Sequence, residues 1–202
     1  TEFEGNYRIT HHRAGENFPL VRCAGCGLIF SWPRPSPEQL ARYYASFDDS
    51  DYEAEAESRQ EIARRQLRWL KNLGAPEGKR LLEIGAATGI FLAEAKGQGY
   101  EVSGIELSDW GRKIAQEKYG LTLLDRPLEN ENFPDSSFDV VCLFDVLEHL
   151  DDPRAMMTEI ARILTPGGAV VLLTPDIGHW RARMMGARWW GIQQAHLFYF
   201  SR

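Results

Sequence analysis

Cysteine is scarce in this chain: there are three cysteines among 202 residues, and two of them form a single Cys-x-x-Cys pair. Three cysteines are too few for a disulfide framework, so a reducing compartment is indicated. The sequence also contains no run of 18 uncharged apolar residues, and its first residues show no basic region followed by an apolar one. We therefore expect no membrane span and no secretory signal, which makes the cytoplasm the expected location.

Basic residues are also fewer than acidic ones. Lysine and arginine total 23 against 29 aspartates and glutamates, which gives a formal net charge of −6 at pH 7. A protein that holds nucleic acid through its phosphate backbone needs a positive surface, so nucleic acid is not an expected partner. A hydrophobic content of 44% and a charged content of 26% indicate a soluble globular protein, long enough for one sizeable core and a small appendage.

Composition divides the chain into three consecutive parts. Residues 1–35 are rich in turns and short β-like runs, and they contain the Cys-x-x-Cys pair. Residues 36–78 have helical patterning and are expected on the substrate side. Their first residues include Ser36 and Gln39, which fit the N-cap and capping-box positions of a helix. Residues 79–202 alternate between β-like and helical patterns, and this alternation predicts an α/β domain.

The helical and β-like periods predict individual elements. A helix is expected at residues 59–73, with an apolar face made of Ile62, Trp69, Leu70 and Leu73. Strands are expected at 80–85, 101–106, 121–125, 138–144 and 169–174. Helices are expected between them at 89–97, 109–119 and 153–164. This order predicts a Rossmann-like, doubly wound and mainly parallel sheet, with its ligand site at the carboxyl ends of the strands.

The unit from residue 80 to residue 107 contains a nucleotide-sized pocket at its first turn. An apolar run leads into five small residues, Gly85 to Gly89, and a helical stretch follows. Small residues let the backbone approach a ligand closely, and the N–H groups at the start of the helix point toward it. Glu106 follows the turn by about 20 residues, where a carboxylate can accept hydrogen bonds from both hydroxyls of a ribose.

This turn does not fit the dinucleotide pattern G-x-G-x-x-G, because Ala87 takes the place of the second glycine. It fits the pattern acidic-x-G-x-x-x-G, in which Glu83 precedes Gly85 by two positions. A carboxylate at that position repels a pyrophosphate and attracts a cationic amino acid. The sequence therefore predicts a ligand with an adenosyl end and a positive end, as in S-adenosylmethionine, and disfavours a nicotinamide dinucleotide.

Four segments between Arg80 and Pro175 resemble the class I S-adenosylmethionine-dependent methyltransferases, especially the small-molecule branch related to ubiquinone and sugar methyltransferases. The segments are EIGAATG, GIELS, FPDSSFDVVCLFDVLEHLDDP and RILTPGGAVVLLTP. The resemblance implies methyl transfer from S-adenosylmethionine to oxygen or carbon of a small-molecule acceptor, with S-adenosylhomocysteine as the product. The family has glycine at the position of Ala87. A non-catalytic protein that keeps the pocket and recruits a partner remains an alternative, as does a nicotinamide-dependent oxidoreductase.

The predicted sheet geometry selects the residues expected to touch the cofactor. Glu83 and Gly85 end the first strand of the unit and face the methionine portion. Ala86 lies in the same turn, and Gly89 opens the following helix. Glu106 is the candidate ribose ligand. The alternative role for each of these residues is ordinary packing.

The adenine and methyl-donor ends have their own candidates. Leu107 is placed to cover one face of the adenine. The resemblance places Leu128 and Glu129 near the other face and the edge of the ring. It also puts Phe144 and Asp145, at the end of the fourth strand, beside the methyl-donor centre. For the two leucines, a role in the core is an equally good interpretation.

Catalysis is harder to place, because methyl transfer mainly requires alignment of the acceptor and exclusion of water. A general base helps when the acceptor is a hydroxyl or an acidic carbon, and histidine is suited to that role near neutral pH. His149 follows the fourth strand and is the candidate base. The alternative is a structural histidine held by Glu148 or by a backbone carbonyl. His196 is a candidate for lining an acceptor cavity or for capping a helix.

The stretch from Gly178 to Arg202 combines three tryptophans with four arginines and has no acidic residue. One interpretation is an acceptor-binding lid for an anionic or ring-shaped molecule, through ion pairing and stacking. Another is an interface helix with aromatic anchors. The composition favours neither.

Cys23 and Cys26 have the spacing of one half of a structural zinc site, which needs four ligands. Cys142 lies in an expected buried strand, whereas His11 and His12 could complete a site. The run LVRCAGCGLIF resembles the second half of a zinc ribbon that some of these methyltransferases carry, which implies a first half before Thr1. A thiol pair in a tight turn without metal is the alternative.

The C-terminal end also differs from the family, whose sheet has seven strands where five are expected here. The run HLFYFSR resembles the start of the helix that precedes the last two strands. We therefore expect a shortened chain. Its fifth strand would leave a sheet edge exposed, through which copies of the chain could associate.

Overall fold

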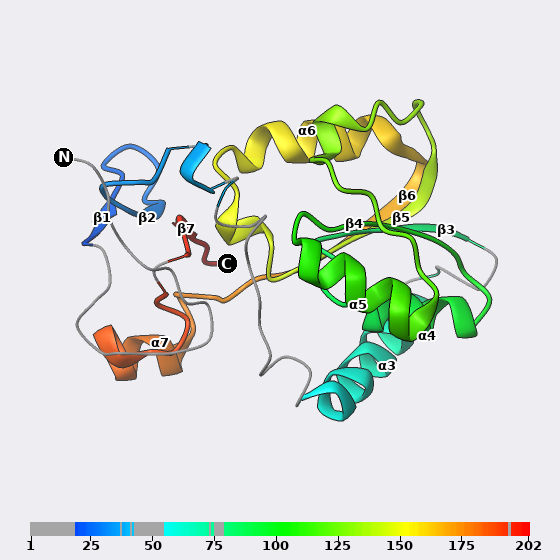
Figure 1. Ribbon diagram of the computed structural model, residues 1–202. Helices are drawn as coiled ribbons and strands as arrows, with labels where there is room; N and C mark the ends of the chain where they lie inside the picture. The colour runs from blue at the N-terminus through cyan, green and yellow to red at the C-terminus, as the bar shows by residue number, and fades with distance from the viewer. Residues whose placement is uncertain are drawn as a thin grey trace. The chain divides into compact units, whose positions relative to one another are not determined.

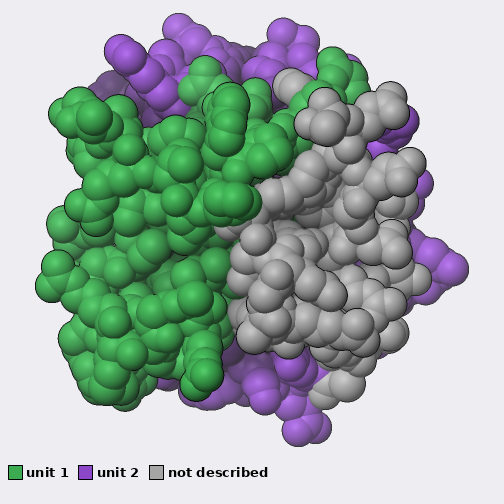
Figure 2. Space-filling model, turned by 90° about the vertical axis from the view of Figure 1, so that its left-hand side faces the viewer, with its two compact units in different colours: residues 1–40, 145–153, 173–202 green, residues 41–144, 154–172 purple. Residues whose placement is uncertain are grey.

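The computed structural model describes residues 19–36, 38–40, 42, 55–72, 74, 79–193 and 195–202. The chain divides into two compact units, which Figure 2 shows in different colours. Unit 1 comprises Thr1–Leu40, Asp145–Pro153 and Leu173–Arg202, and unit 2 comprises Ala41–Phe144 and Arg154–Leu172. Both units are assembled from separated stretches, whereas the three segments predicted from composition are consecutive. Those segment boundaries stay a prediction.

Unit 2 is built on a four-stranded sheet of order β4-β3-β5-β6, which confirms the predicted α/β class (Figure 1). The strands are β3 (Arg80–Ile84), β4 (Glu101–Ile105), β5 (Phe138–Phe144) and β6 (Leu164–Leu173). β3 pairs in parallel with β4 on one side and with β5 on the other. The carboxyl ends of these three strands therefore lie at one edge of the sheet, where a ligand site is expected.

The strand predicted at residues 121–125 does not form. Leu124 alone makes a parallel bridge to Ile105, through hydrogen bonds from its N–H to Gly104 (2.8 Å) and from Glu106 N–H to its carbonyl (2.9 Å). Leu121 and Leu123 are buried as a strand pattern requires. The apolar pattern of residues 121–125 therefore predicted burial correctly. A single bridge with two hydrogen bonds, however, does not make these residues a strand of the sheet.

Helices cover both faces of this sheet (Figure 1). They are α3 (Ala56–Asn72), α4 (Ile90–Gly97), α5 (Asp109–Tyr119) and α6 (Pro153–Ile163). α3, α4 and α5 lie on one side of the sheet and α6 lies on the other. The bounds of α5 match the prediction because both ends carry local signals. The hydroxyl of Ser108 accepts the N–H of Gly111 (3.1 Å), and Gly120 ends the helix with a φ of 61°.

The core follows the alternation of side chains along the strands. Leu81, Val140 and Cys142 belong to one buried cluster with apolar residues of α3, α4 and α5. The intervening residues Leu82 and Val141 are also fully buried, and they point to the opposite face. Both faces are thus covered, as expected for a sheet with helices on both sides.

The apolar face predicted for α3 is confirmed at Leu70 and wrong at Ile62 and Trp69. Ile62 and Trp69 are 43% and 47% exposed, whereas Ala63, Leu67 and Leu70 are buried against the core. Ile62 and Trp69 each precede a buried residue by one position, which places them about 100° away around the helix axis. The buried residues of α3 pack in one cluster with apolar residues of α4. Leu73 lies outside the described residues.

Unit 1 contains a three-stranded antiparallel sheet of order β1-β2-β7. Its strands are β1 (Leu20–Arg22), β2 (Ile29–Ser31) and β7 (Phe198–Tyr199), and it also holds the short helix α7 (Trp180–Met185). The prediction that HLFYFSR begins a helix is wrong, because β7 lies within it. Ile29 pairs with Tyr199, and Ser31 N–H donates to the carbonyl of Leu197 (3.0 Å). This long-range pairing overrides the local resemblance.

In the part of the chain that the structure describes, no helix is both long and apolar enough to cross a membrane.

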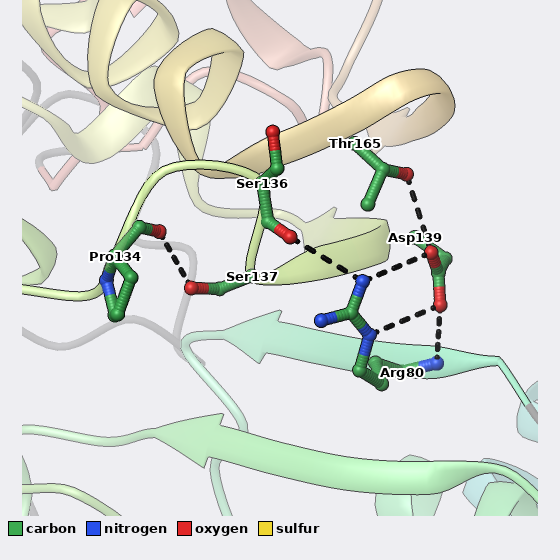
Figure 3. A network of polar contacts seen from close by, with 6 residues as sticks. All are labelled: Arg80, Pro134, Ser136, Ser137, Asp139 and Thr165. Atoms are coloured by element: carbon green, nitrogen blue, oxygen red, sulfur yellow. Dashed lines mark hydrogen bonds and ion pairs between the residues drawn. The ribbon is translucent and has the colours of Figure 1, made fainter.

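A polar network joins the amino ends of β3 and β5 (Figure 3). Asp139 accepts hydrogen bonds from the backbone N–H of Arg80 (2.9 Å), from the Arg80 guanidinium (3.3 Å) and from the Thr165 hydroxyl (3.2 Å). These contacts, led by the Arg80 side chain, lower the pKa of Asp139. The carboxylate thus fixes the start of β3 to β5 and to β6.

We expect Asp139→Ala to lower the free energy of unfolding by about 1–2 kcal/mol, because several charge-assisted hydrogen bonds are lost together. Urea denaturation measures this change. Asp135→Ala is the control, since Asp135 pairs with Arg162 at the surface with 78% of its side chain exposed. We expect that variant to change stability by less than about 0.5 kcal/mol. Equal effects for the two variants would contradict the role of Asp139.

Candidate cofactor pocket and neighbouring clusters

The turn after β3 adopts a conformation that demands small residues. Gly85, Ala87 and Gly89 have φ values of 75°, 47° and 77°. The N–H groups of Gly85 and Ala86 both donate to the carbonyl of Ile105 (2.9 Å each). A side chain at position 89 would lie 3.1 Å from the Cβ of Ala115. Left-handed backbone and close packing together explain the glycines that begin and end the turn.

Ala87 has a left-handed backbone conformation, although the family it resembles has glycine there. Left-handed backbone costs an alanine about 1 kcal/mol, and glycine loses a similar amount through the greater freedom of the unfolded chain. We therefore expect Ala87→Gly to change the free energy of unfolding by less than about 0.5 kcal/mol. Ala93→Gly, inside α4, is the matched control and should cost about 1 kcal/mol. Thermal denaturation of both variants checks the difference, and equal losses would contradict it.

The carboxylate of Glu106 is held by the backbone around it. One oxygen accepts the N–H of Ala87 (2.7 Å), and the other accepts the N–H of Ser108 (2.8 Å). Burial raises the pKa of Glu106, and the two N–H donors together with the Arg112 charge partly offset that rise. A carboxylate offers about four acceptor positions. Two N–H donors therefore leave room for hydroxyl groups of a ligand.

Glu83 is buried in the sheet with an unsatisfied oxygen. The residue is 4% exposed, it pairs in register with Gly104 and Cys142, and its Oε2 has no hydrogen-bond partner. Burial, followed by the negative charge of Glu106, raises the pKa of Glu83 well above its usual value. Two carboxyl groups near one another, with one of them unsatisfied, favour a bound cation.

The remaining predicted cofactor residues have mixed positions. Leu107 is half-buried, directly after Glu106, and Phe144 is half-buried with its ring centroid 4.8 Å from that of Phe91. Leu128 begins the short helix η1 (Leu128–Asn130) and is fully buried, whereas Glu129 is exposed. Full burial of Leu128 agrees with a role in the core. Their contacts with a cofactor stay predictions.

Unit 1 brings together three titratable side chains. Glu148 and His149 lie in the short helix η2 (Leu147–His149), and His196 lies just before β7. The ring centroids of the two histidines are 4.7 Å apart, and one ligand atom of each of the three residues lies within 4.8 Å of the others. Such a cluster can exchange a proton or share a cation.

Each histidine of this cluster is oriented by a backbone carbonyl. His149 Nδ1 lies 2.9 Å from the carbonyl of Ala195, and His196 Nδ1 lies 2.9 Å from that of Gly191. Each Nδ1 must therefore carry a proton, which leaves Nε2 as the basic atom of the neutral ring. The sequence had offered a carbonyl contact as the alternative role for His149, and that contact is present. His196 instead contacts a loop carbonyl and the ring of His149.

Burial shifts the pKa values of His149 and Glu148 in opposite directions. It lowers the pKa of His149 to about 4, and the hydrogen bond to Ala195 partly offsets the shift. Burial, followed by the negative charge of Asp145, raises the pKa of Glu148 to about 7. Neither carboxylate oxygen of Glu148 has a hydrogen-bond partner, although the Thr174 hydroxyl lies close enough to lower its pKa slightly. Asp145 itself has a φ of 53°, a conformation that is uncommon for residues other than glycine, although aspartate adopts it more often than most.

Neither the shifted pKa of Glu148 nor the contact of His196 with His149 was predicted from the sequence. The available signal for Glu148 was an acidic residue inside the apolar run Leu147 to Leu150. No sequence signal joins His196 to that run, because a fold-level contact brings them together.

Cys23 and Cys26 lie in a tight turn between β1 and β2. Gly27 N–H donates to the carbonyl of Cys23 (2.9 Å), and Cys23 N–H donates to that of Leu28 (2.9 Å). N–H groups of Cys26 and Gly25, in that order, lower the pKa of the Cys23 thiol. Backbone donors aimed at a sulfur favour the thiolate, which is the form that binds metal. The described residues add no third ligand to this pair, and His11 and His12 lie outside them.

A family described as a methyltransferase domain matches residues 54–202. The ubiquinone biosynthesis O-methyltransferase of Thiobacillus denitrificans is 32% identical over 120 residues, which cover 56% of this chain and 52% of that protein. The chain thus spans about half the length of the curated relatives it matches.

Two solved structures have the same fold. One is described as a methyltransferase of an antibiotic biosynthesis pathway in Anabaena variabilis, with a TM-score of 0.50, 29% identity, and coverage of 56% of this chain and 46% of that one. The other is an S-adenosylmethionine-dependent methyltransferase of Archaeoglobus fulgidus, with a TM-score of 0.60, 21% identity, and coverage of 76% and 69%. Because the family match covers most of the chain, the chain belongs to the methyltransferase-domain family.

Proposed function

We propose that this member of the methyltransferase-domain family transfers a methyl group from S-adenosylmethionine to an oxygen or carbon atom of a small-molecule acceptor. S-adenosylhomocysteine is then the second product. The observation that carries the proposal is Glu83, a buried carboxyl group with an unpartnered oxygen, close enough to Glu106 for their charges to interact. S-adenosylmethionine carries positive charge at its sulfonium and ammonium groups, which suits this pair. A pyrophosphate would be repelled there, and this argues against a nicotinamide dinucleotide.

The turn after β3 provides the proposed methionine end of the site. Glu83 faces the cationic part of the ligand, and Gly85 and Ala86 allow close approach of the backbone. Gly89 opens α4, whose first N–H groups add a positive potential. Glu106 accepts hydrogen bonds from the ribose through its remaining acceptor positions.

The adenine and the methyl donor are assigned to other elements. Leu107 and Leu128 are proposed to pack against the faces of the adenine, and Glu129 lies at its edge. Phe144 ends β5 at the carboxyl edge of the sheet, and it is proposed to lie beside the methyl-donor centre. Removal of water by such apolar side chains favours displacement at the activated carbon.

A proton acceptor is proposed in the cluster of His149, Glu148 and His196. A pKa of about 4 keeps His149 neutral at pH 7 but makes it a weak base. Glu148, with a pKa of about 7, is better matched to the working pH. We therefore assign the base to His149 acting together with Glu148: His149 accepts the proton, and the ionised carboxylate of Glu148 offsets its weak basicity by stabilising the imidazolium.

Calorimetry with S-adenosylmethionine, S-adenosylhomocysteine and NAD tests the proposal. We expect binding of the first two in the micromolar range and none of NAD. Glu106→Ala should weaken binding by about 1–3 kcal/mol, because hydrogen bonds to a charged group are lost. Glu101→Ala, at the exposed start of β4, which ends one residue before Glu106, is the control and should bind as the parent does. Binding of NAD, or unchanged affinity in Glu106→Ala, would overturn the assignment.

Binding alone does not distinguish an enzyme from a non-catalytic protein that recruits a partner. Transfer of an isotope-labelled methyl group to a panel of small acceptors makes that distinction. The panel should include anionic and ring-bearing molecules, which the aromatic and arginine-rich C-terminal stretch favours. Tight cofactor binding without turnover on any of them would favour the non-catalytic alternative.

A second proposal concerns Cys23 and Cys26. We propose that they supply two ligands of a structural zinc ion, with the other two from residues outside the described part of the chain. The lowered pKa of Cys23 supports it. Metal analysis of a chain extended before Thr1, compared with its Cys26→Ser variant, is the test. We expect one zinc ion in the first and none in the second; absence of zinc from both would refute the proposal.

Association of copies through the sheet edge is also proposed. β6 is an outer strand of its sheet, and Leu172 and Leu173 on it are 41% and 39% exposed. Sedimentation velocity over a range of concentrations tests this, and a Leu172→Lys variant should remain monomeric if the edge mediates the contact. The proposed acceptor chemistry and a cytoplasmic location are compatible with either state.

A further inference from the structure

A cavity of about 670 Å³ lies wholly within unit 1. It is formed by three elements: the β1–β2 hairpin, the stretch from Ile177 to Ile192 that contains α7, and the end of the chain at β7. Its volume is in the range of pockets that hold small molecules. None of the residues assigned to the cofactor or to the proton acceptor lines it.

The walls of the cavity combine polar groups with several apolar side chains that their neighbours hold in position. Ile29 and Tyr199, which pair across β2 and β7, both line it, as does Trp189. Trp189 is 4% exposed, and its indole lies so close to Gly191 that a Cβ there would come within 2.5 Å of the ring. The Tyr199 hydroxyl donates to the carbonyl of Gln193 (3.1 Å). These contacts provide a preformed surface for a flat apolar group.

The charged groups of the cavity are both positive. Arg22, at the end of β1, and Arg183, in α7, line it, and its lining contains no aspartate or glutamate. Within the described residues, neither guanidinium forms an ion pair with a protein carboxylate. Most of the described arginines that do form ion pairs lie in unit 2. Two unneutralised guanidinium groups in one cavity favour an anion, because each can form paired hydrogen bonds with a carboxylate or phosphate.

We propose that this cavity binds a small organic anion, with an apolar ring against Trp189 and Ile29 and a carboxylate or phosphate group paired with Arg22 and Arg183. The proposal concerns binding and stands apart from the methyl-transfer reaction. If the bound anion is also the methyl acceptor, that additional role rests on the proposed function. Measuring anion binding in the absence of S-adenosylmethionine tests the cavity independently of methyl transfer.

The experiment uses 2-naphthoate and 2-naphthyl phosphate as anionic probes, and 2-naphthamide as a neutral probe of the same shape. Calorimetry gives the affinities, and ¹H–¹⁵N spectra follow the indole N–H of Trp189, assigned with a Trp189→Phe variant. We expect both anions, but not the amide, to bind and to shift that signal. Arg22→Gln and Arg183→Gln should each weaken anion binding about tenfold, and binding should fall as salt is raised.

Arg181→Gln and Arg188→Gln are matched controls, since both arginines lie in the same stretch but outside the lining. They should bind as the parent does. Equal affinity for the amide, equal loss in all four variants, or no shift of the Trp189 signal would each overturn the proposal. A parent that binds S-adenosylmethionine but neither anion would refute the cavity while leaving the proposed function intact. The reverse result would refute the proposed function alone.

Discussion

Glu83→Gln is expected to weaken S-adenosylmethionine binding about a hundredfold or more, while leaving the protein at least as stable as the parent. The two effects have one cause. Glu83 is buried with an unpartnered oxygen beside a second carboxyl group, so its charge opposes folding until a cation is bound. Removal of a buried charge that pairs with a ligand costs about 2–5 kcal/mol of binding. Glutamine keeps the shape of the side chain and removes the charge.

The pH dependence of stability gives an independent check of the same residue. The pKa of Glu83 is raised in the folded state, so its protonated form favours folding. That contribution is fully present below the unfolded pKa and is lost as pH rises through the folded value. The parent should therefore lose stability relative to Glu83→Gln as pH rises above about 4.5, the usual glutamate value.

Calorimetry and urea denaturation at several pH values measure both effects. Glu101→Gln, on the exposed start of β4, is the control for a glutamate without these surroundings. Two results would contradict the argument: unchanged cofactor affinity in Glu83→Gln, or a loss of stability in that variant at pH 8. The first would remove Glu83 from the site, and the second would mean that its carboxylate is satisfied in the folded protein.

The second large effect concerns Glu148 and His149, whose pH dependences should oppose each other. The pKa of His149 falls from 6.5 to about 4 on folding, so the unfolded chain binds the extra proton and stability rises with pH over that range. The pKa of Glu148 rises from 4.5 to about 7, so stability falls with pH over that range. Each shift corresponds to about 3 kcal/mol. In the parent the two slopes nearly cancel between about pH 4.5 and 6.5.

Single variants should reveal the two slopes. Glu148→Gln leaves the His149 contribution, so this variant should gain about 3 kcal/mol of stability between pH 4 and 6.5 relative to its value at low pH. His149→Asn keeps a donor for the Ala195 carbonyl and leaves the Glu148 contribution, so it should lose a similar amount between pH 4.5 and 7. Thermal or urea denaturation at half-unit pH steps measures both curves.

The double variant should show neither slope, and His179→Asn, an exposed histidine, should follow the parent. Parallel curves for the parent and Glu148→Gln would mean that the pKa of Glu148 is not raised by folding. Parallel curves for the parent and His149→Asn would mean that folding does not lower the pKa of His149. Because His149 is also the proposed first proton acceptor, turnover of these variants reports on a separate property from their stability.

The parts of the fold that were predicted from the sequence are those with local causes. β5 and α5 have the predicted bounds, because an apolar run and a pair of helix caps are each contained in one stretch of chain. The face of α3 was predicted correctly at Leu70 but not at Ile62 and Trp69, since several neighbouring residues have helical spacing and packing against the core decides which of them are buried. β7 was also missed, because its strand conformation depends on pairing with β2.

The candidate site also contains features with local causes, which were predicted, and long-range contacts, which were not. Glu83 and Glu106 belong to one β-α-β unit, so their spacing along the chain already predicts that they flank one pocket. The contact of His149 with His196 depends on a loop that returns from far along the chain, and residue spacing carries no information about it. The cavity beside Trp189 combines both cases: its arginines and aromatic residues were visible in composition, but the participation of the β1–β2 hairpin was not.

The three-stranded sheet of unit 1 has a consequence for the order in which the chain folds. The Ser31 hydroxyl donates to the carbonyl of His196, 165 positions along the chain, and β2 pairs with β7 at a similar sequence separation. Closing so long a loop costs more entropy than joining β3 to β4, and contacts of high sequence separation form slowly. The β1–β2 hairpin can therefore pair with β7 only after the intervening chain has been synthesised, when the β-α-β unit can already be complete. Residues that precede the β-α-β unit in the chain would thus reach their final partners after it.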